Sequence, residues 1–230
     1  MADKGTPTPL LATLLALTAV SGVVDAVCYL GLGRVFTANM TGNVVVFGFA
    51  VAGARGFSVT ATLTSLAFFL IGAFCAGRAA PWVARDNGVS HRLLLVAMGT
   101  EACFVATAAL IAALAATVAT GWARYVVIGL LAFAMGVRNA TVRRLAVPDM
   151  TTTVLTLTLT GLAADAGGER ATTVYRRTGA LAAMLTGAIV GAALYLHQRA
   201  ALPLLIAAVV VTAAGVALRL STSSDATMVR

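Results

Sequence analysis

Residues 21–53 read SGVVDAVCYLGLGRVFTANMTGNVVVFGFAVAG, and they place one acid and a run of Asn, Thr and Gly inside an apolar stretch. The chain around them has 230 residues, is 60% hydrophobic and only 10% charged, and has a mean hydropathy of +0.96. A soluble domain carries about 25% charged residues and, at this length, could not bury so much apolar material. The composition therefore predicts an all-α polytopic membrane protein, a single membrane domain over 1–230 with short polar tails at 1–8 and 221–230.

Apolar runs divide the chain into eight segments, and six of them are long enough for the roughly 20 residues that a spanning helix needs. The second and sixth runs are shorter and rich in Thr, Asn and Gly, which favours re-entrant or broken helices over full spans. The runs lie near 10–32, 36–54, 58–80, 92–117, 123–142, 150–166, 176–197 and 200–219.

The positive charges favour six spans over eight. If all eight runs cross the membrane, the 16 Lys and Arg residues divide eight against eight. If the second and sixth runs enter and leave on one side, twelve lie on the N-terminal side and four on the other. Because cytoplasmic loops carry an excess of Lys and Arg, we expect about six spans, two short re-entrant or broken polar helices, and both termini in the cytoplasm. Eight spans in two parallel repeats is the alternative.

An internal repeat is visible at a shift of about 115 residues. This shift aligns 35–55 with 150–170 and 70–73 with 185–188, and a shift of 114 aligns Asp25 with Asn139. The repeats cover approximately 10–117 and 123–219. With three spans in each half, the second half enters the membrane from the opposite side, which predicts two inverted repeats. In transporters this architecture brings interrupted helices to a site near the midplane.

The two short polar segments are the best candidates for such a site. Asn and Thr side chains cost free energy when they face lipid, whereas they can cap a broken helix or coordinate a ligand, and Gly permits a sharp bend. The expected substrate-binding residues are Asp25, Asn39, Met40, Thr41, Gly42 and Asn43 in the first half and Asn139, Thr152, Thr153 and Thr156 in the second.

Charged residues inside the apolar runs are costly and point to function. Asp25 and Glu101 are the proton-coupling candidates, and a hydrogen bond from Asp25 to a neighbouring broken segment is the alternative for that residue. Arg138, Arg143 and Arg144 are interpreted first as positive anchors on the cytoplasmic side. An anion-binding or Asp25-pairing role is their alternative.

Other function classes receive little support. Cys28, Cys75 and Cys103 have no ligand-like spacing, and with only His91 and His197 present no metal site or cofactor is expected. The sequence contains no GxSxG, HExxH or phosphate-binding loop, so an enzyme is not expected. The net charge of +8 fits loops at an anionic membrane face rather than nucleic acid. The expected partners are the lipid bilayer and an unknown small-molecule or ion substrate, and a homo-oligomer is possible.

The opening stretch resembles the first motif of the YoaK-like bacterial membrane proteins, the family called domain of unknown function 1275. The family pattern, Gly-x-x-Asp-Ala followed by Phe-x-Ala-x-Met-Thr-Gly-Asn, is carried by Gly22, Asp25, Ala26, Phe36, Ala38, Met40, Thr41, Gly42 and Asn43. The second half resembles it through Gly136, Asn139, Ala140, Arg144, Thr152 and Thr153, with Leu155-Thr156-Leu157 where the family has a second Met-Thr-Gly. The resemblance implies a multi-pass protein of the bacterial inner membrane with about six spans, and it implies no particular substrate.

These observations together favour a small secondary transporter or permease with a polar site near the membrane midplane. The alternative is a non-transporting membrane scaffold or sensor, in which the polar segments only hold the helices together.

Overall fold

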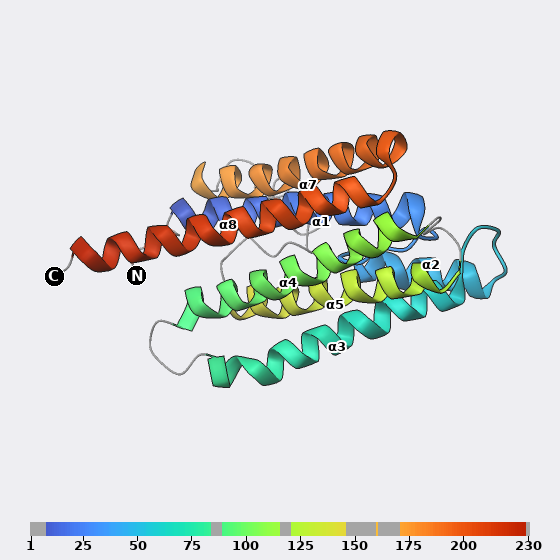
Figure 1. Cartoon of the computed structure of the whole chain (residues 1–230), viewed down its shortest axis with the longest axis horizontal. Helices are drawn as coiled ribbons and strands as arrows, with labels where there is room; N and C mark the ends of the chain where they lie inside the picture. The colour runs from blue at the N-terminus through green and yellow to red at the C-terminus, as the bar shows by residue number, and fades with distance from the viewer. Residues whose placement is uncertain (1–7, 84–88, 116–120, 146–159, 161–170, 229–230) are drawn as a thin grey trace.

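The structure, a computed structural model, describes residues 8–83, 89–115, 121–145, 160 and 171–228. This part of the chain forms seven helices and no strand (Figure 1). They are α1 (Thr8–Gly31), α2 (Met40–Val51), α3 (Val59–Val83), α4 (Val89–Leu114), α5 (Trp122–Leu145), α7 (Ala171–Gln198) and α8 (Ala201–Met228). Helix α8 therefore extends through most of the segment that we expected to be a polar tail.

Six of these helices are long and apolar enough to cross a membrane, and α2 is the short one. At 1.5 Å per residue the 12 residues of α2 span about 18 Å, less than the roughly 30 Å of a bilayer core. The prediction of six spans is confirmed, and the first short segment does not form a seventh. The second short segment, near 150–166, lies almost entirely outside the described residues.

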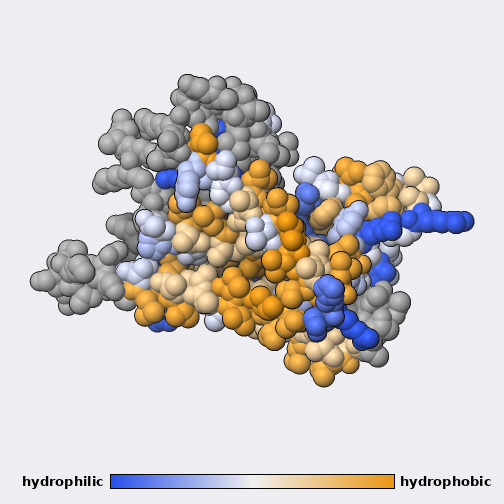
Figure 2. All heavy atoms as spheres, turned by 90° about the horizontal axis from the view of Figure 1, so that it is seen from above, coloured by the Kyte–Doolittle hydropathy of each residue, from blue (hydrophilic) through white to orange (hydrophobic). Residues whose placement is uncertain are grey.

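Successive long helices run in opposite directions, so both ends of the described chain lie at the same end of the bundle (Figure 1). Large apolar side chains such as Phe74, Leu185 and Val209 face outward between the ends. Figure 2 shows the same arrangement as an apolar surface over the middle of the bundle, with hydrophilic residues toward both ends. This is the surface that a lipid bilayer requires.

Helix α2 lies at the opposite end of the bundle, between the end of α1 and the start of α3 (Figure 1). The chain reverses after α1 through Gly33 (φ 97°) and Arg34 (φ 58°), a left-handed backbone that glycine adopts without strain. Residues 35–39 then run back into the bundle, and α2 leads out again. The first short segment thus enters and leaves at one end, as a re-entrant segment does.

Helices α1 and α5 form the interior of the bundle: 67% of the apolar window of each is buried, against 28% for α3 and 17% for α7. Glycines let α1 lie against α7. A Cβ atom at Gly22 would overlap the backbone at Met184, and a Cβ atom at Gly187 would overlap the backbone at Ala19. Small residues permit this close approach of helix backbones in a membrane.

The pair α3 and α5 is packed in the same manner. A Cβ atom at Gly136 of α5 would overlap the backbone at Phe69, and one at Gly72 of α3 would overlap the backbone at Phe133. Helices α4 and α8 pack on each other and on the two interior helices. Both interior helices therefore have fixed positions from which polar side chains can be presented.

Candidate functional site

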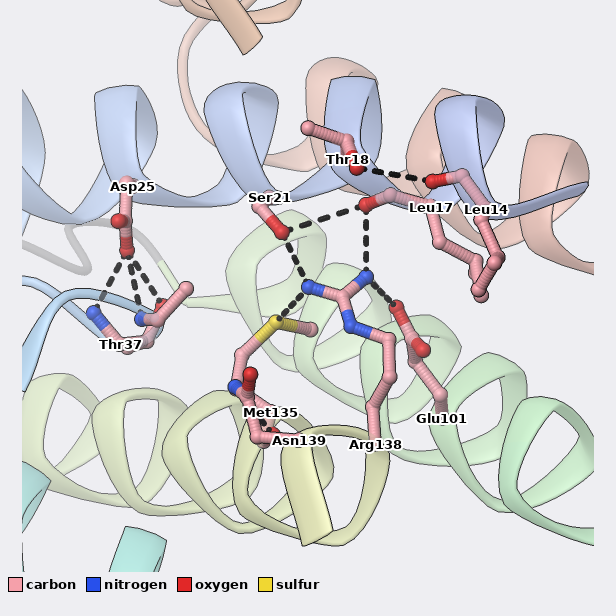
Figure 3. Close-up of polar contacts among 11 residues, drawn as sticks. Leu14, Leu17, Thr18, Ser21, Asp25, Thr37, Glu101, Met135, Arg138 and Asn139 are labelled. Atoms are coloured by element: carbon pink, nitrogen blue, oxygen red, sulfur yellow. Dashed lines mark hydrogen bonds and ion pairs between the residues drawn. The ribbon is translucent and has the colours of Figure 1, made fainter. Parts of the chain in front are cut away.

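Asp25 on α1 holds the re-entrant segment in place. Its Oδ1 atom accepts hydrogen bonds from Thr37 N (2.7 Å), Ala38 N (2.9 Å) and the Thr37 hydroxyl (3.1 Å), as Figure 3 shows. The Asp25 carboxylate is buried, and the two backbone donors belong to residues 37 and 38, which bend outside any helix and have no helical partners. Because unsatisfied backbone groups are costly inside a membrane, the carboxylate replaces the partners that a helix would supply.

Asn43 fixes the next part of this segment. Its Oδ1 atom accepts a hydrogen bond from Phe36 N (2.8 Å), and its Nδ2 atom donates to Phe36 O (2.7 Å) and to the Ser65 hydroxyl (3.0 Å). The Ser65 hydroxyl also donates to Phe36 O at 2.5 Å, which ties the segment to α3. Gly42 lies against the Phe36 ring, which a Cβ atom would approach to 2.9 Å. Asn43 and Gly42 therefore shape the backbone.

The first residues of α2 face a different environment. Asn39 is the N-cap of α2 and its side chain accepts a hydrogen bond from Gly42 N at 3.2 Å. Asn39 and Thr41 are exposed and Met40 is half-buried. The first turn of α2 contains no acidic residue, so the positive end of the helix dipole is not neutralised locally.

These residues line a cavity of about 900 Å³ between the start of α2, the middle of α3 and the last two turns of α5. The wall from α5 carries Asn139, Ala140, Arg143 and Arg144, and the wall from α3 carries Phe69 and Ala73. The cavity therefore combines amide and hydroxyl groups, two guanidinium groups and an apolar wall.

The arginines of this wall are placed at the end of the bundle where the chain ends lie. The Nη2 atom of Arg144 donates to Gly77 O at 3.0 Å, which anchors this side chain to α3. Both Arg143 and Arg144 are exposed. Asn139 lies deeper and donates to Met135 O at 2.9 Å. The cavity thus extends from the interior of the bundle toward that end.

A second polar cluster lies in the interior, where Arg138 of α5 reaches between α1 and α4 (Figure 3). Its Nη1 atom donates to Glu101 Oε1 (2.9 Å) and to Leu17 O (2.8 Å), and its Nη2 atom donates to the Ser21 hydroxyl and approaches Met135 Sδ. Arg138 and Glu101 are fully buried. The interpretation of Arg138 as a positive anchor is wrong, because its guanidinium is paired in the core of the bundle and does not reach a membrane surface.

The predicted site residues therefore divide into groups. Asn39, Met40, Thr41 and Asn139 come together around the cavity, although they lie in different halves of the sequence. Asp25, Gly42 and Asn43 do not line the cavity and instead hold the segment that forms one of its walls. Glu101 lies in the ion pair with Arg138. Thr152, Thr153 and Thr156 lie outside the described residues.

Sequence reasoning missed Ser65 and Ser21 as partners of the polar clusters. A serine in a membrane helix usually bonds to a carbonyl of its own preceding turn, so neither position gave a signal. The pairing of Glu101 with Arg138 could have been predicted from the sequence, because charged residues inside spans usually pair with each other.

The six apolar spans, the re-entrant α2 and the buried polar clusters define a multi-pass α-helical membrane protein. The chain belongs to the family described as protein of unknown function (DUF1275), whose profile matches residues 13–217. It is 34% identical over 163 residues to the UPF0700 transmembrane protein YoaK of Bacillus subtilis (strain 168), covering 69% of this chain and 67% of the relative. The expected resemblance to YoaK-like proteins is thereby confirmed. No solved structure matches the chain.

Proposed function

We propose that this protein is a small secondary transporter whose substrate site is the cavity between α2, α3 and α5. The observation that carries the proposal is that this cavity of about 900 Å³ is lined by polar side chains from both halves of the chain, inside a bundle of apolar spans. A scaffold needs no such space, because polar residues that only hold helices together are satisfied by one another, as Asn43 and Ser65 are.

The helix packing supports an inverted repeat, the architecture of many secondary transporters. Gly22 of α1 and Gly136 of α5 are related by the shift of 114 residues, and each lies against a helix of the other half. The residues Gly187 of α7 and Gly72 of α3, related by a shift of 115, make the matching contacts from the other side. Since α1 and α5 also run in opposite directions (Figure 1), we infer that the two halves are inverted copies.

This arrangement suggests how access could alternate. Each interior helix pairs closely with the second long helix of the other half, giving the two units α1 with α7 and α5 with α3. The cavity lies on the α5–α3 unit and against the re-entrant segment that Asp25 of α1 holds. The segment is bonded to both units, to α1 through Asp25 and to α3 through Ser65, so rocking of one unit against the other would displace it relative to at least one of them and change the shape of the cavity.

We propose that the protein lies in the bacterial inner membrane with both termini in the cytoplasm, and the distribution of arginine supports this orientation. Among the described residues, seven arginines belong to the end of the bundle where the chain ends lie, and four to the other end. The seven are Arg78, Arg92, Arg143, Arg144, Arg176, Arg177 and Arg219, and the four are Arg34, Arg55, Arg124 and Arg199.

The test of the transporter proposal is the water access of Thr41 from the two sides of the membrane. In a variant whose three native cysteines are replaced by alanine, Thr41→Cys is treated with a membrane-impermeant maleimide in inside-out and in right-side-out vesicles. A transporter exposes this position alternately, so we expect labelling in both orientations. Labelling in one orientation only would make the cavity a static vestibule and favour the scaffold or sensor.

Two control positions calibrate this experiment. Ala54→Cys lies in the exposed connection between α2 and α3. It should be labelled only from the side of the membrane opposite to the chain ends. Val45→Cys lies on the outward face of α2, where Val45 is 52% exposed, and should resist a water-soluble reagent if that face contacts lipid.

A further inference from the structure

Among the described residues that line the cavity, the charges have one sign. Of these eleven residues, Arg143 and Arg144 carry full positive charges and none is acidic. The buried acids of the bundle are engaged elsewhere, Asp25 by the backbone of the re-entrant segment and Glu101 by Arg138. Within the described part of the chain, no carboxylate therefore competes for the guanidinium groups at the cavity wall.

The remaining polar groups of the wall can serve as donors. The Asn39 side chain carries an amide NH₂ group and Thr41 contributes a hydroxyl, whereas the NH₂ group of Asn139 donates to Met135 O. The first turn of α2 adds backbone N–H groups and the positive end of its helix dipole. Arg143 lies on the wall that α5 forms, and its side chain makes no hydrogen bond to any of the described residues, whereas that of Arg144 is anchored to Gly77.

The cavity also has an apolar part and is too large for an inorganic anion alone. Its volume of about 900 Å³ falls within the range of small-molecule sites. An apolar surface lies beside the donors. It is supplied by Phe69 and Ala73 of α3, together with Ala38 and Val142. A ligand that uses both parts carries an anionic group and an apolar body.

We infer that the cavity binds an organic anion, with its carboxylate or phosphate group held by Arg143, Arg144 and the start of α2 and its apolar body against Phe69 and Ala73. This inference deepens the proposed function, on which it rests for the identity of the site. Two kinds of ligand combine an anionic group with an apolar body: a soluble organic acid and an anionic lipid, whose headgroup region carries the charge.

The test measures the melting temperature of the purified protein in an uncharged detergent with defined probes. Benzoate and phenyl phosphate supply the anionic group with an aromatic body, and benzyl alcohol is the neutral counterpart of benzoate. We expect both anions, and not benzyl alcohol, to raise the melting temperature in a saturable manner. Equal stabilisation by benzyl alcohol, or no stabilisation by either anion or by the lipid below, would overturn the inference.

Arg143→Gln is the informative variant, because it removes one charge and leaves the Arg144–Gly77 contact intact. We expect the apparent affinity for benzoate to fall roughly tenfold or more, since hydrogen bonds to charged groups are the strong ones. The matched control is Arg219→Gln, which removes an exposed arginine from the same end of the bundle and does not line this cavity. An equal fall in both variants would show a general charge effect and contradict the site.

The two sources are separated by adding phosphatidylglycerol or phosphatidylcholine in place of the soluble probes. Stabilisation by phosphatidylglycerol alone, lost in Arg143→Gln, would retain the anion site and assign it to lipid. The proposed function fails separately: one-sided labelling of Thr41→Cys with intact benzoate binding would overturn transport and keep the anion site. Labelling of Thr41→Cys from both sides, with no response of the melting temperature to any anion, would keep transport and overturn the anion site.

Discussion

Arg138 of α5 donates to Glu101 of α4 across 2.9 Å, and neither side chain is exposed to any solvent. The guanidinium also donates to the carbonyl of Leu17 and to the Ser21 hydroxyl of α1. One side chain thus joins α1, α4 and α5 in the core. Arg138 is next to Asn139 in sequence, so α5 presents adjacent residues to the ion pair and to the cavity.

Glu101→Gln is expected to destabilise the protein, because it leaves the charge of Arg138 buried without an anionic partner. Removing one partner of a buried ion pair costs about 3 kcal/mol or more. The free energy of unfolding, measured by titration with a denaturing detergent, should fall accordingly. The double variant Glu101→Gln with Arg138→Met should recover much of the loss, and a double variant as unstable as the single one would contradict this account.

Asp25→Ala is expected to release the re-entrant segment from α1. The substitution leaves Thr37 N and Ala38 N without an acceptor, and an unsatisfied buried donor costs about 1–3 kcal/mol. The melting temperature should fall, and maleimide labelling of Thr37→Cys should be faster in the Asp25→Ala background than with Asp25 intact.

Asp25→Asn is the control for this prediction, since an amide oxygen still accepts hydrogen bonds from the same donors. It should lose less stability than Asp25→Ala. If the two variants were equally stable and Asn stopped transport, the charge of Asp25 would have the proton-coupling role expected from the sequence.

Asn43→Ala should cost more than Ser65→Ala, although both side chains contact Phe36. Asn43 is the partner of both Phe36 N and Phe36 O, whereas the loss of Ser65 leaves Phe36 O with its bond from Asn43. We expect a loss of about 2 kcal/mol for Asn43→Ala and about 1 kcal/mol for Ser65→Ala. Thermal unfolding of the purified variants measures the difference, and the reverse order would refute this account of the cluster.

Two glycines on α3 allow a matched test of the helix packing. A Cβ atom at Gly72 would overlap the backbone of α5 at Phe133, whereas one at Gly77 would meet nothing within 4 Å. Gly72→Ala should therefore destabilise by about 1–3 kcal/mol. Gly77→Ala should be neutral or stabilising by up to about 1 kcal/mol, because alanine favours the helix.

The inferred repeat extends this prediction to α7. Gly187→Ala should behave as Gly72→Ala does, because a Cβ atom at Gly187 meets the backbone at Ala19 in the same way. Denaturing-detergent titrations of the three variants measure the effect. A harmless Gly187→Ala beside a costly Gly72→Ala would count against equivalent packing in the two halves.

The repeat and the short polar segment are recognisable in the sequence because both leave local marks there. The motif around Asn39 and Thr41 interrupts an apolar run, and the constant shift pairs Gly22 with Gly136. That pairing matches Asn139 with Asp25, and the expectation that Asn39 and Asn139 share one site came from the inverted-repeat architecture. The sequence could not predict that Asn39 lines the cavity while Asn43 bonds to Phe36 and Ser65. Asn39 and Asn43 are only four residues apart, and their environments differ only through the side chains and backbone that pack against each of them.

The sequence by itself determined the membrane class, the six spans and the members of the first polar segment, because hydropathy, length and charge balance are properties of composition and order. Only the tertiary structure decided what each polar residue faces. Asp25 and Arg138 bond to partners 12 and 37 residues away, whereas Asn39, Thr41 and Asn139 line a cavity. The physical reason is that a buried polar group needs a hydrogen-bond partner. Where that partner lies on another helix, it is set by the packing of the helices, which the local sequence does not show.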